Sequence, residues 1–199
     1  MSDQHSDSTQ VGSLPVFAAE RRRGGSSELE REVIALFDSH RSRLLAYVRT
    51  FGIAGHDAEE VVQEVFLALF RHLQMGKPRN QLHGWMFRVA HNLALKQRMA
   101  SQRWRNWIDP NQDFTNDFAE THRDPSPNPE EYAVSAQRQR RLSSVVSALP
   151  EQDQWCLYLR AEGLRYREIA EVLGISLGSV SNSLSRSLER LLRADGGAA

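Results

Sequence analysis

The sequence has one cysteine and no long apolar run, and each absence excludes a class of protein. Cys156 cannot form a disulfide within the chain, which excludes a disulfide-stabilised secreted scaffold and is typical of a reducing cytoplasm. We expect this cysteine to be a small buried hydrophobe and not a reactive thiol. No apolar stretch approaches the ~20 residues that a membrane-spanning helix needs, and residues 1–23 lack the apolar segment of a signal peptide. The expected location is therefore the cytoplasm, without a membrane partner.

The chain also lacks the residue sets that catalysis and metal binding need. The acidic residues near position 60 have no matching second cluster of carboxylates, and the histidines follow no metal-ligand spacing. A small helical enzyme acting on nucleic acid is therefore disfavoured. We expect neither enzymatic activity nor a bound metal or cofactor.

Acidic residues are absent from residues 65–108, although the whole chain has 25 basic and 25 acidic residues. Glu59, Glu60 and Glu64 lie just before this acid-free window. Its basic residues are Arg71, Lys77, Arg79, Arg88, Lys96, Arg98, Arg103 and Arg105. A protein that needs only solubility mixes charges of both signs. Because the window also contains aromatic rings on which bases can stack, it favours binding to a polyanion such as a nucleic acid.

Apolar residues recur at helical spacing and strand-like alternation is nearly absent, which predicts an all-α protein. We expect two small helical domains, at residues 28–107 and 129–194. Residues 108–128 are rich in proline and acidic residues, which is typical of a flexible acidic linker. Residues 1–27 have the composition of a disordered leader, and residues 195–199 that of a frayed tail. Within the first domain we expect three helices, the second capped by Asp57 and separated from the third by a loop at residues 75–84.

Residues 165–193 have the pattern of a helix-turn-helix motif. A short amphipathic helix at residues 166–173 precedes Gly174, where a turn with positive φ costs little. Ser176 is a candidate N-cap for the next helix. The buried stripe of that helix is expected at Val180, Leu184, Leu188 and Leu191. An ordinary helical hairpin would share this pattern, whereas in a helix-turn-helix the start of the second helix enters the major groove of DNA.

Small polar residues and one arginine lie on the free face of this second helix. Hydroxyl and amide side chains can bind phosphates or base edges, and Arg186 could reach a guanine or a phosphate. The candidate DNA-binding residues are Ser176, Gly178, Ser179, Ser181, Asn182, Ser185 and Arg186.

Two faces of the first domain are candidates for binding. One face of the second expected helix consists of Glu60, Gln63, Glu64, Leu67 and Arg71, and it is either a solvated surface or a docking face for a basic partner. One face of the third expected helix consists of Arg88, His91, Asn92, Leu95 and Arg98. There Asn92 can hydrogen-bond to the edge of an unpaired base while the arginines hold phosphates. The loop before that helix could receive an extruded base.

Two motifs carry a resemblance to a known family. Residues 57–66, DAEEVVQEVF, and residues 85–92, WMFRVAHN, resemble the second conserved region of extracytoplasmic-function (ECF) sigma factors. Residues 149–192, which begin LPE and include the helix-turn-helix pattern, resemble their fourth region. The resemblance covers about residues 32–192, with both motifs in the order of the family.

The resemblance implies a bacterial initiation subunit that joins core RNA polymerase, through its β′ clamp helices and β subunit, and directs it to promoter DNA. It implies a polymerase-binding set at Glu60, Gln63, Glu64 and Phe66. It implies a set for the melted minus-ten element at Lys77, Arg79, Arg88, Asn92, Lys96 and Arg98. The helix-turn-helix would read the minus-thirty-five element, and many relatives are held by an anti-sigma factor.

Three positions depart from the family pattern. Ser181 and Ser183 stand where the family often has lysine or arginine, and His91 stands where it often has arginine. Each lost phosphate contact should reduce the salt dependence of DNA binding by ~0.9 in log–log slope. The remaining alternative is a two-domain helix-turn-helix regulator that does not join polymerase, which would not need the motif at residues 57–66.

Overall fold

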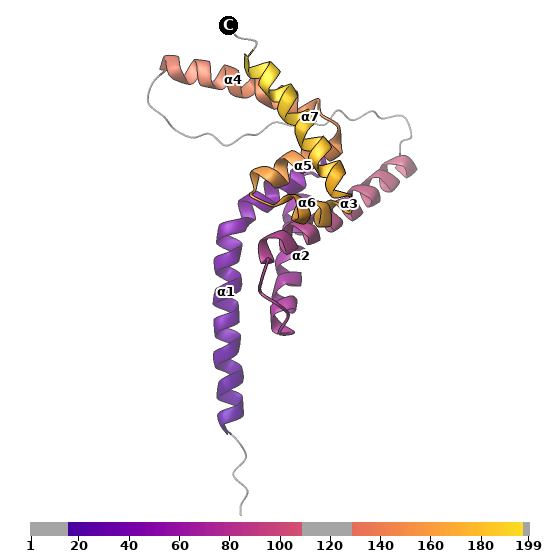
Figure 1. Ribbon diagram of the computed structural model, residues 1–199. Helices are drawn as coiled ribbons and strands as arrows, with labels where there is room; N and C mark the ends of the chain where they lie inside the picture. Colours follow the sequence, from indigo (N-terminus) through magenta and orange to yellow (C-terminus); the bar gives the residue numbers. More distant parts are fainter. Residues whose placement is uncertain (1–15, 109–128, 197–199) are drawn as a thin grey trace, which may run out of the picture.

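A computed structural model describes the backbone of residues 16–108 and 129–196, and the side chains of residues 28–103 and 137–196. The predicted linker and tail lie outside these residues, apart from Ile108, Asp195 and Gly196. Every regular element in the described part is a helix (Figure 1). The helices are α1 (Val16–Arg49), α2 (Gly55–Gln74), α3 (Leu82–Ile108), α4 (Pro129–Ser147), α5 (Glu151–Ala161), α6 (Tyr166–Leu173) and α7 (Leu177–Gly196). The predicted all-α fold of two domains is confirmed.

The first domain consists of α1, α2 and α3, which pack around an aromatic and aliphatic core. Phe37 of α1 meets Phe66 of α2 edge-on, with ring centroids 4.8 Å apart. Tyr47 is fully buried and lies edge-on to both Phe51 and Phe87. These contacts fix α1 and α3 relative to each other, so they determine where the exposed face of α3 points.

Helix α1 begins at Val16, whereas a disordered leader was expected up to residue 27. Residues 17–23 consist of phenylalanine, alanine, glutamate and arginine. Alanine, glutamate and arginine are strong helix formers, which favours a helix at residues 17–23, although Gly24 and Gly25 within α1 are weak helix formers. The N-terminal half of α1 extends away from the other helices in Figure 1.

The second domain consists of α4 to α7. Helix α4 lies along α7, where the guanidinium of Arg138 pairs with the carboxylate of Asp195. Helices α5 and α6 pack on the opposite end of α7. Cys156 of α5 is fully buried, and burial raises the pKa of its thiol to about 11. The prediction of an inert, buried cysteine is therefore confirmed.

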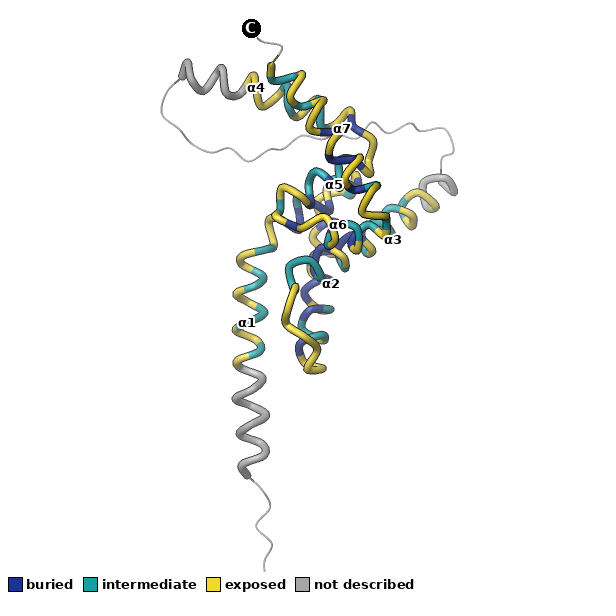
Figure 2. Tube along the Cα trace, viewed as in Figure 1, coloured by how far each residue is buried: buried dark blue, intermediate teal, exposed yellow. Residues whose placement is uncertain are grey.

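The two domains pack against each other, chiefly through α3 and α6, and their buried residues form one continuous cluster. Figure 2 shows buried segments where α1 and α3 of the first domain lie near α5 and α6 of the second. The residue pattern predicted two domains but not this contact. It places the helix-turn-helix directly beside the first domain.

We predict opposite effects on stability for two glycines of the helix-turn-helix. Gly174 has φ 67°, in the left-handed region, so Gly174→Val should lower the free energy of unfolding by about 1–2 kcal/mol. Gly178 lies in the first turn of α7, with its nearest neighbour, Ser176 Oγ, 3.8 Å from an added Cβ. Gly178→Ala should therefore be neutral or raise stability by up to about 1 kcal/mol. Urea unfolding followed by circular dichroism measures both, and equal effects would contradict the assigned turn.

Candidate polymerase and nucleic-acid interfaces

The acidic face of α2 is exposed, as predicted. Glu60, Gln63 and Glu64 all lie on the surface, with Leu67 half exposed between them. Glu60 is 3.3 Å from His56, and Glu64 is 3.7 Å from Arg71, so both carboxylates have only loose partners on their own helix. This face therefore combines negative charge with an exposed apolar side chain, which suits a protein partner.

Two expectations for α2 are wrong. Phe66 is buried against Phe37, because it is two residues beyond Glu64 and so points to the opposite side of the helix. Asp57 does not cap the helix, which begins at Gly55 after Ala54 without a side-chain cap. Asp57 lies in the first turn, where Oδ2 accepts a long hydrogen bond of 3.4 Å from the Gln97 amide of α3. Phe66 and Asp57 therefore stabilise the domain.

Helix α3 presents a row of three exposed polar side chains, Arg88, Asn92 and Lys96, at intervals of four residues. The row has two positive charges with an amide between them. Arg98 instead lies toward the second domain, where it pairs with Glu151 at 2.6 Å. The structure therefore separates Arg98 from the row.

The loop between α2 and α3 spans residues 75–81 and is exposed. Lys77 extends into solvent, whereas Arg79 is 3.1 Å from Glu32 of α1. His72 fixes the base of the loop, because its Nε2 is 3.1 Å from the Pro78 carbonyl oxygen and its ring centroid is 4.6 Å from that of Trp85. The loop is thus anchored at its base while its polar groups face outward.

His91 is buried, which contradicts the prediction that it shares the exposed face of Asn92. It is 3 % exposed and its Nδ1 is 2.8 Å from the Tyr47 hydroxyl. Its ring also lies edge-on to Phe51 and to Trp155 of α5. Burial lowers the pKa of His91 to about 4, so the imidazole is neutral at neutral pH. A histidine at this position belongs to an aromatic core and makes no phosphate contact.

We predict that His91 makes stability depend on pH. Its pKa is about 4 in the fold against about 6.5 when unfolded, so only the unfolded chain gains a proton as pH falls between these values. Because of this residue, the free energy of unfolding should therefore fall by about 2 kcal/mol when the pH is lowered from 7.5 to 5. Urea unfolding at both pH values should show a smaller fall in the free energy of unfolding for His91→Gln than for the wild type. The control His56→Gln removes a histidine whose side chain is 84 % exposed, and it should leave the loss unchanged.

The helix-turn-helix is confirmed in its main features. Helix α6 has the expected bounds, and Gly174 takes the left-handed conformation that ends it. Ser176 caps α7, because its Oγ accepts a hydrogen bond of 3.1 Å from the backbone N–H of Ser179. Gly178, Ser181, Asn182 and Ser185 are exposed along the start of α7. The recognition face is thus made of short polar side chains.

The buried stripe of α7 differs from the expected one. Leu188 is 50 % exposed, whereas Ser183 and Ser187 are fully buried beside Val180 and Leu184. The Ser187 hydroxyl donates to the Ser183 carbonyl at 2.8 Å, so its polarity is satisfied within the helix. Because these serines are small, α5 can lie close to α7. Ser183 is therefore not part of the exposed face of α7, although the resemblance implied a phosphate-binding position there.

Arg186 is held by the second domain itself. Its Nε and Nη2 donate to the two carboxylate oxygens of Asp153, at 3.3 and 2.9 Å. Asp153 lies on α5 and is 2 % exposed, and its hydrogen bonds raise the pKa of Arg186. Breaking this pair would leave a buried carboxylate unpaired, which is costly. Arg186 therefore fixes α7 against α5, while its side chain stays 56 % exposed and its contact with a guanine or a phosphate stays a prediction.

Comparison with known proteins identifies the family. The model of sigma-70 region 2 matches residues 36–105 and that of sigma-70 region 4 matches residues 139–191. The chain is 27 % identical over 168 residues to the ECF RNA polymerase sigma-E factor of Haemophilus influenzae, covering 81 % of this chain and 87 % of that protein. The chain belongs to the ECF sigma factors. As such it binds core RNA polymerase and promoter DNA and directs promoter recognition and transcription initiation.

A second relative and a solved structure are also sigma factors. The sigma factor is 32 % identical over 137 residues to the ECF RNA polymerase sigma factor SigE of Mycolicibacterium smegmatis, covering 68 % of this chain and 51 % of that protein. It is similar in fold to the sigma factor RpoE of Bartonella quintana, solved in complex with the anti-sigma factor NepR. That similarity has a TM-score of 0.62 at 16 % identity, over 86 % of this chain and 99 % of the other.

Two absences hold for the part of the chain that the structure describes. Within that part, no helix is long and apolar enough to span a membrane. The same part of the chain contains no group of three histidine, cysteine or acidic side chains that could hold a metal ion. Sigma factors are DNA-binding regulators rather than enzymes. The candidate site is therefore a set of binding surfaces.

Proposed function

We propose that the sigma factor divides its contacts between opposite sides of the first domain. The acidic face of α2, with Glu60, Gln63 and Glu64, binds the basic clamp helices of the polymerase β′ subunit. The row on α3 and the loop at residues 75–81 hold the melted minus-ten element. The observation that carries this proposal is the separation of charge, since exposed acids lie on α2 and the row on α3 falls within a window free of acids.

The α3 row has a geometry that suits an unpaired strand. Opening a duplex costs on average ~1.4 kcal/mol per base step, and binding of the displaced strand has to offset this. Arg88 and Lys96 are placed one helical turn on either side of Asn92, so they can hold phosphates while the amide bonds to a base edge. Lys77 in the loop adds a third positive charge. These three exposed groups support the proposal of a strand-binding site on this side of the domain.

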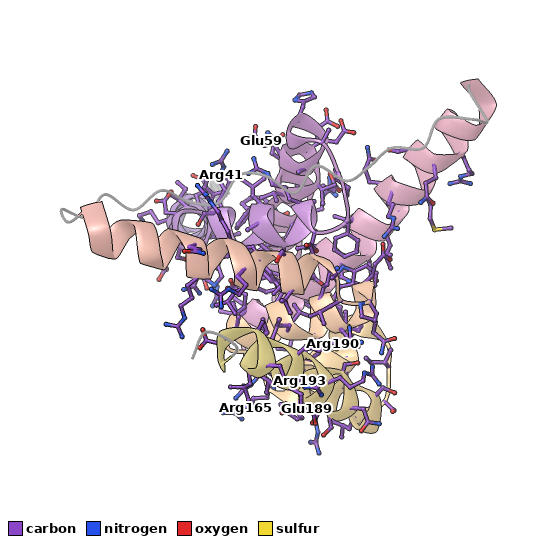
Figure 3. All side chains as sticks on the ribbon, turned by 90° about the horizontal axis from the view of Figure 1, so that it is seen from above. Arg41, Glu59, Arg165, Glu189, Arg190 and Arg193 are labelled. Carbon is purple, nitrogen blue, oxygen red and sulfur yellow. The ribbon has the colours of Figure 1, made fainter. Side chains whose placement is uncertain are left out.

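The second domain is proposed to read the minus-thirty-five element with the start of α7. Its exposed serines and Asn182 can bond to base edges, but with Arg186 bound to Asp153 the recognition face has few charges. Arg165 and Arg190 lie at the surface of this domain (Figure 3) and are candidates for phosphate contacts. Binding by this domain alone is then weak and depends on tethering through polymerase.

The remaining partners and the location follow from this role. The Bartonella quintana relative is solved with an anti-sigma factor, and we propose that a partner of the same class regulates this chain. Because its proposed partner is RNA polymerase, the site of action is the cytoplasm. Initiation is catalysed by the polymerase, so the sigma factor contributes binding and no catalytic step, and requires no cofactor.

Asn92→Ala is predicted to impair promoter opening without affecting polymerase binding. Loss of a base contact worth about 1–3 kcal/mol should reduce the yield of open complex about tenfold or more. The yield is measured by permanganate footprinting with core polymerase, beside the control Gln102→Ala, which changes an exposed amide near the end of the same helix. An unchanged yield in Asn92→Ala would remove this role. If the wild-type chain binds promoter DNA but never initiates with polymerase, the chain is a regulator.

Glu60→Arg with Glu64→Arg is predicted to weaken binding to core polymerase by at least about tenfold. Reversing two exposed charges turns attraction to basic clamp helices into repulsion. Fluorescence anisotropy of the labelled chain with core polymerase measures the Kd. The control makes an equal change of charge on the second domain, at the exposed Glu171 and Glu189. Equal affinities for both double variants would contradict the docking face.

A further inference from the structure

The first three turns of α7 contain a single charged side chain, that of Arg186. Asn182 lies one helical turn before it on the same side of the helix, and both are exposed. The other exposed polar residues of these turns are serines. Because serines are short, Arg186 is the side chain that extends furthest from this face, toward any base edge in the major groove.

The guanidinium of Arg186 has two edges, and each can donate two parallel hydrogen bonds. The side edge, formed by Nε and Nη2, is occupied by Asp153, at 3.3 Å from Oδ2 and 2.9 Å from Oδ1. The end edge is formed by Nη1 and Nη2. Among the described residues its one contact is long, 3.5 Å from Nη2 to the Ser183 hydroxyl oxygen. The end edge can therefore bind a second pair of acceptors while the side edge stays bound to Asp153.

Asp153 is placed so that it keeps Arg186 when DNA binds. Its carboxylate is 2 % exposed, and among the described residues Arg186 is the only partner of its oxygens. Withdrawing one member of a buried ion pair leaves a charge without compensation, which is strongly unfavourable. Asp153 also lies in the first turn of α5, where the helix dipole favours a negative charge. DNA therefore meets Arg186 in its pair with α5.

A held arginine suits a guanine better than a phosphate. The O6 and N7 atoms of guanine are two neighbouring acceptors in the major groove, which match the two donors of the end edge. A phosphate also offers two oxygens, but its attraction depends on net positive charge. The carboxylate of Asp153 compensates the charge of Arg186 and leaves the directions of its N–H groups unchanged. The pair therefore favours recognition by geometry.

We propose that Asp153 is a positioning residue, which holds the guanidinium of Arg186 so that its end edge reads one guanine in the promoter element bound by α7. The inference rests on the proposed function, which assigns the minus-thirty-five element to the start of α7. A side chain that is ordered before binding loses less entropy when DNA arrives. Adenine has an N6 amino donor in place of the guanine O6, so it would set two donors against each other.

The decisive experiment measures base preference with the full chain and core polymerase. Promoter duplexes randomised across the minus-thirty-five element are selected by binding and sequenced. The wild type should prefer guanine at one position by about tenfold. Asp153→Asn removes the negative charge and one of the two acceptors, and it should lower that preference at least about fivefold, with the other positions unchanged. The matched control Glu189→Gln removes one charge from an exposed side chain of the same helix and should keep the preference.

Two further measurements separate positioning from folding. Asp153→Asn leaves the charge of Arg186 without compensation, so binding to duplexes that lack the guanine should strengthen and become steeper in salt by ~0.9 in log–log slope. A loss of folded protein would instead weaken binding to every sequence. Arg186→Lys keeps the charge without the planar fork, and it should also remove the preference. In the Asp153→Asn background this second change should then have little further effect.

Each contrary outcome has a distinct meaning. An unchanged guanine preference in Asp153→Asn would overturn the positioning role. A stronger preference would overturn it too, because Asp153 would then be keeping Arg186 away from the base. Equal losses on all sequences, with lower helicity by circular dichroism, would assign the pair to folding alone. A wild type without any base preference in this element would refute the proposed function of α7, and the inference with it.

Discussion

The burial of Tyr47 is the interaction on which both domains depend. Its ring contacts Phe51 in the turn after α1, Phe87 and His91 of α3, and Tyr158 of α5. Removing this ring would leave a cavity where three helices meet, at a cost of about 3–5 kcal/mol if it resembles other buried aromatic residues. The same side chain thus helps to fix the direction of α3, helps to bury His91 and forms part of the surface that contacts the second domain.

Much of the fold could be predicted from the sequence, because helical periodicity and turn residues are local signals. The bounds of α6, the left-handed Gly174 and the Ser176 cap all depend on residues within one or two turns. The errors arose where a side chain meets another element. Leu188 is exposed where burial was expected, and Ser183 is buried. The reason is that α5 packs against the side of α7 that carries the serines.

The site was predicted to the level of faces but not of single residues. Residues three or four positions apart share a face of a helix, yet this spacing does not determine which edge of the face is buried by another helix. His91 and Arg98 lie beside the exposed row on α3, and both contact α5. His91 meets the ring of Trp155, and Arg98 pairs with Glu151. The side of α5 that meets the first domain, with Trp155 and Tyr158, is visible in the sequence as a second helical spacing, but its partners lie more than 50 residues away.

Charge neutrality has a physical meaning in this architecture. A sigma factor with a net positive charge would bind DNA of any sequence, because contacts with the phosphates release counterions. Here Arg98 and Arg186 are paired with carboxylates, which limits the positive charge that is free to meet DNA. Under the proposed function, productive binding requires both an acidic face for polymerase and a strand already exposed. Each requirement is weak alone, so selectivity comes from meeting all of them on one polymerase.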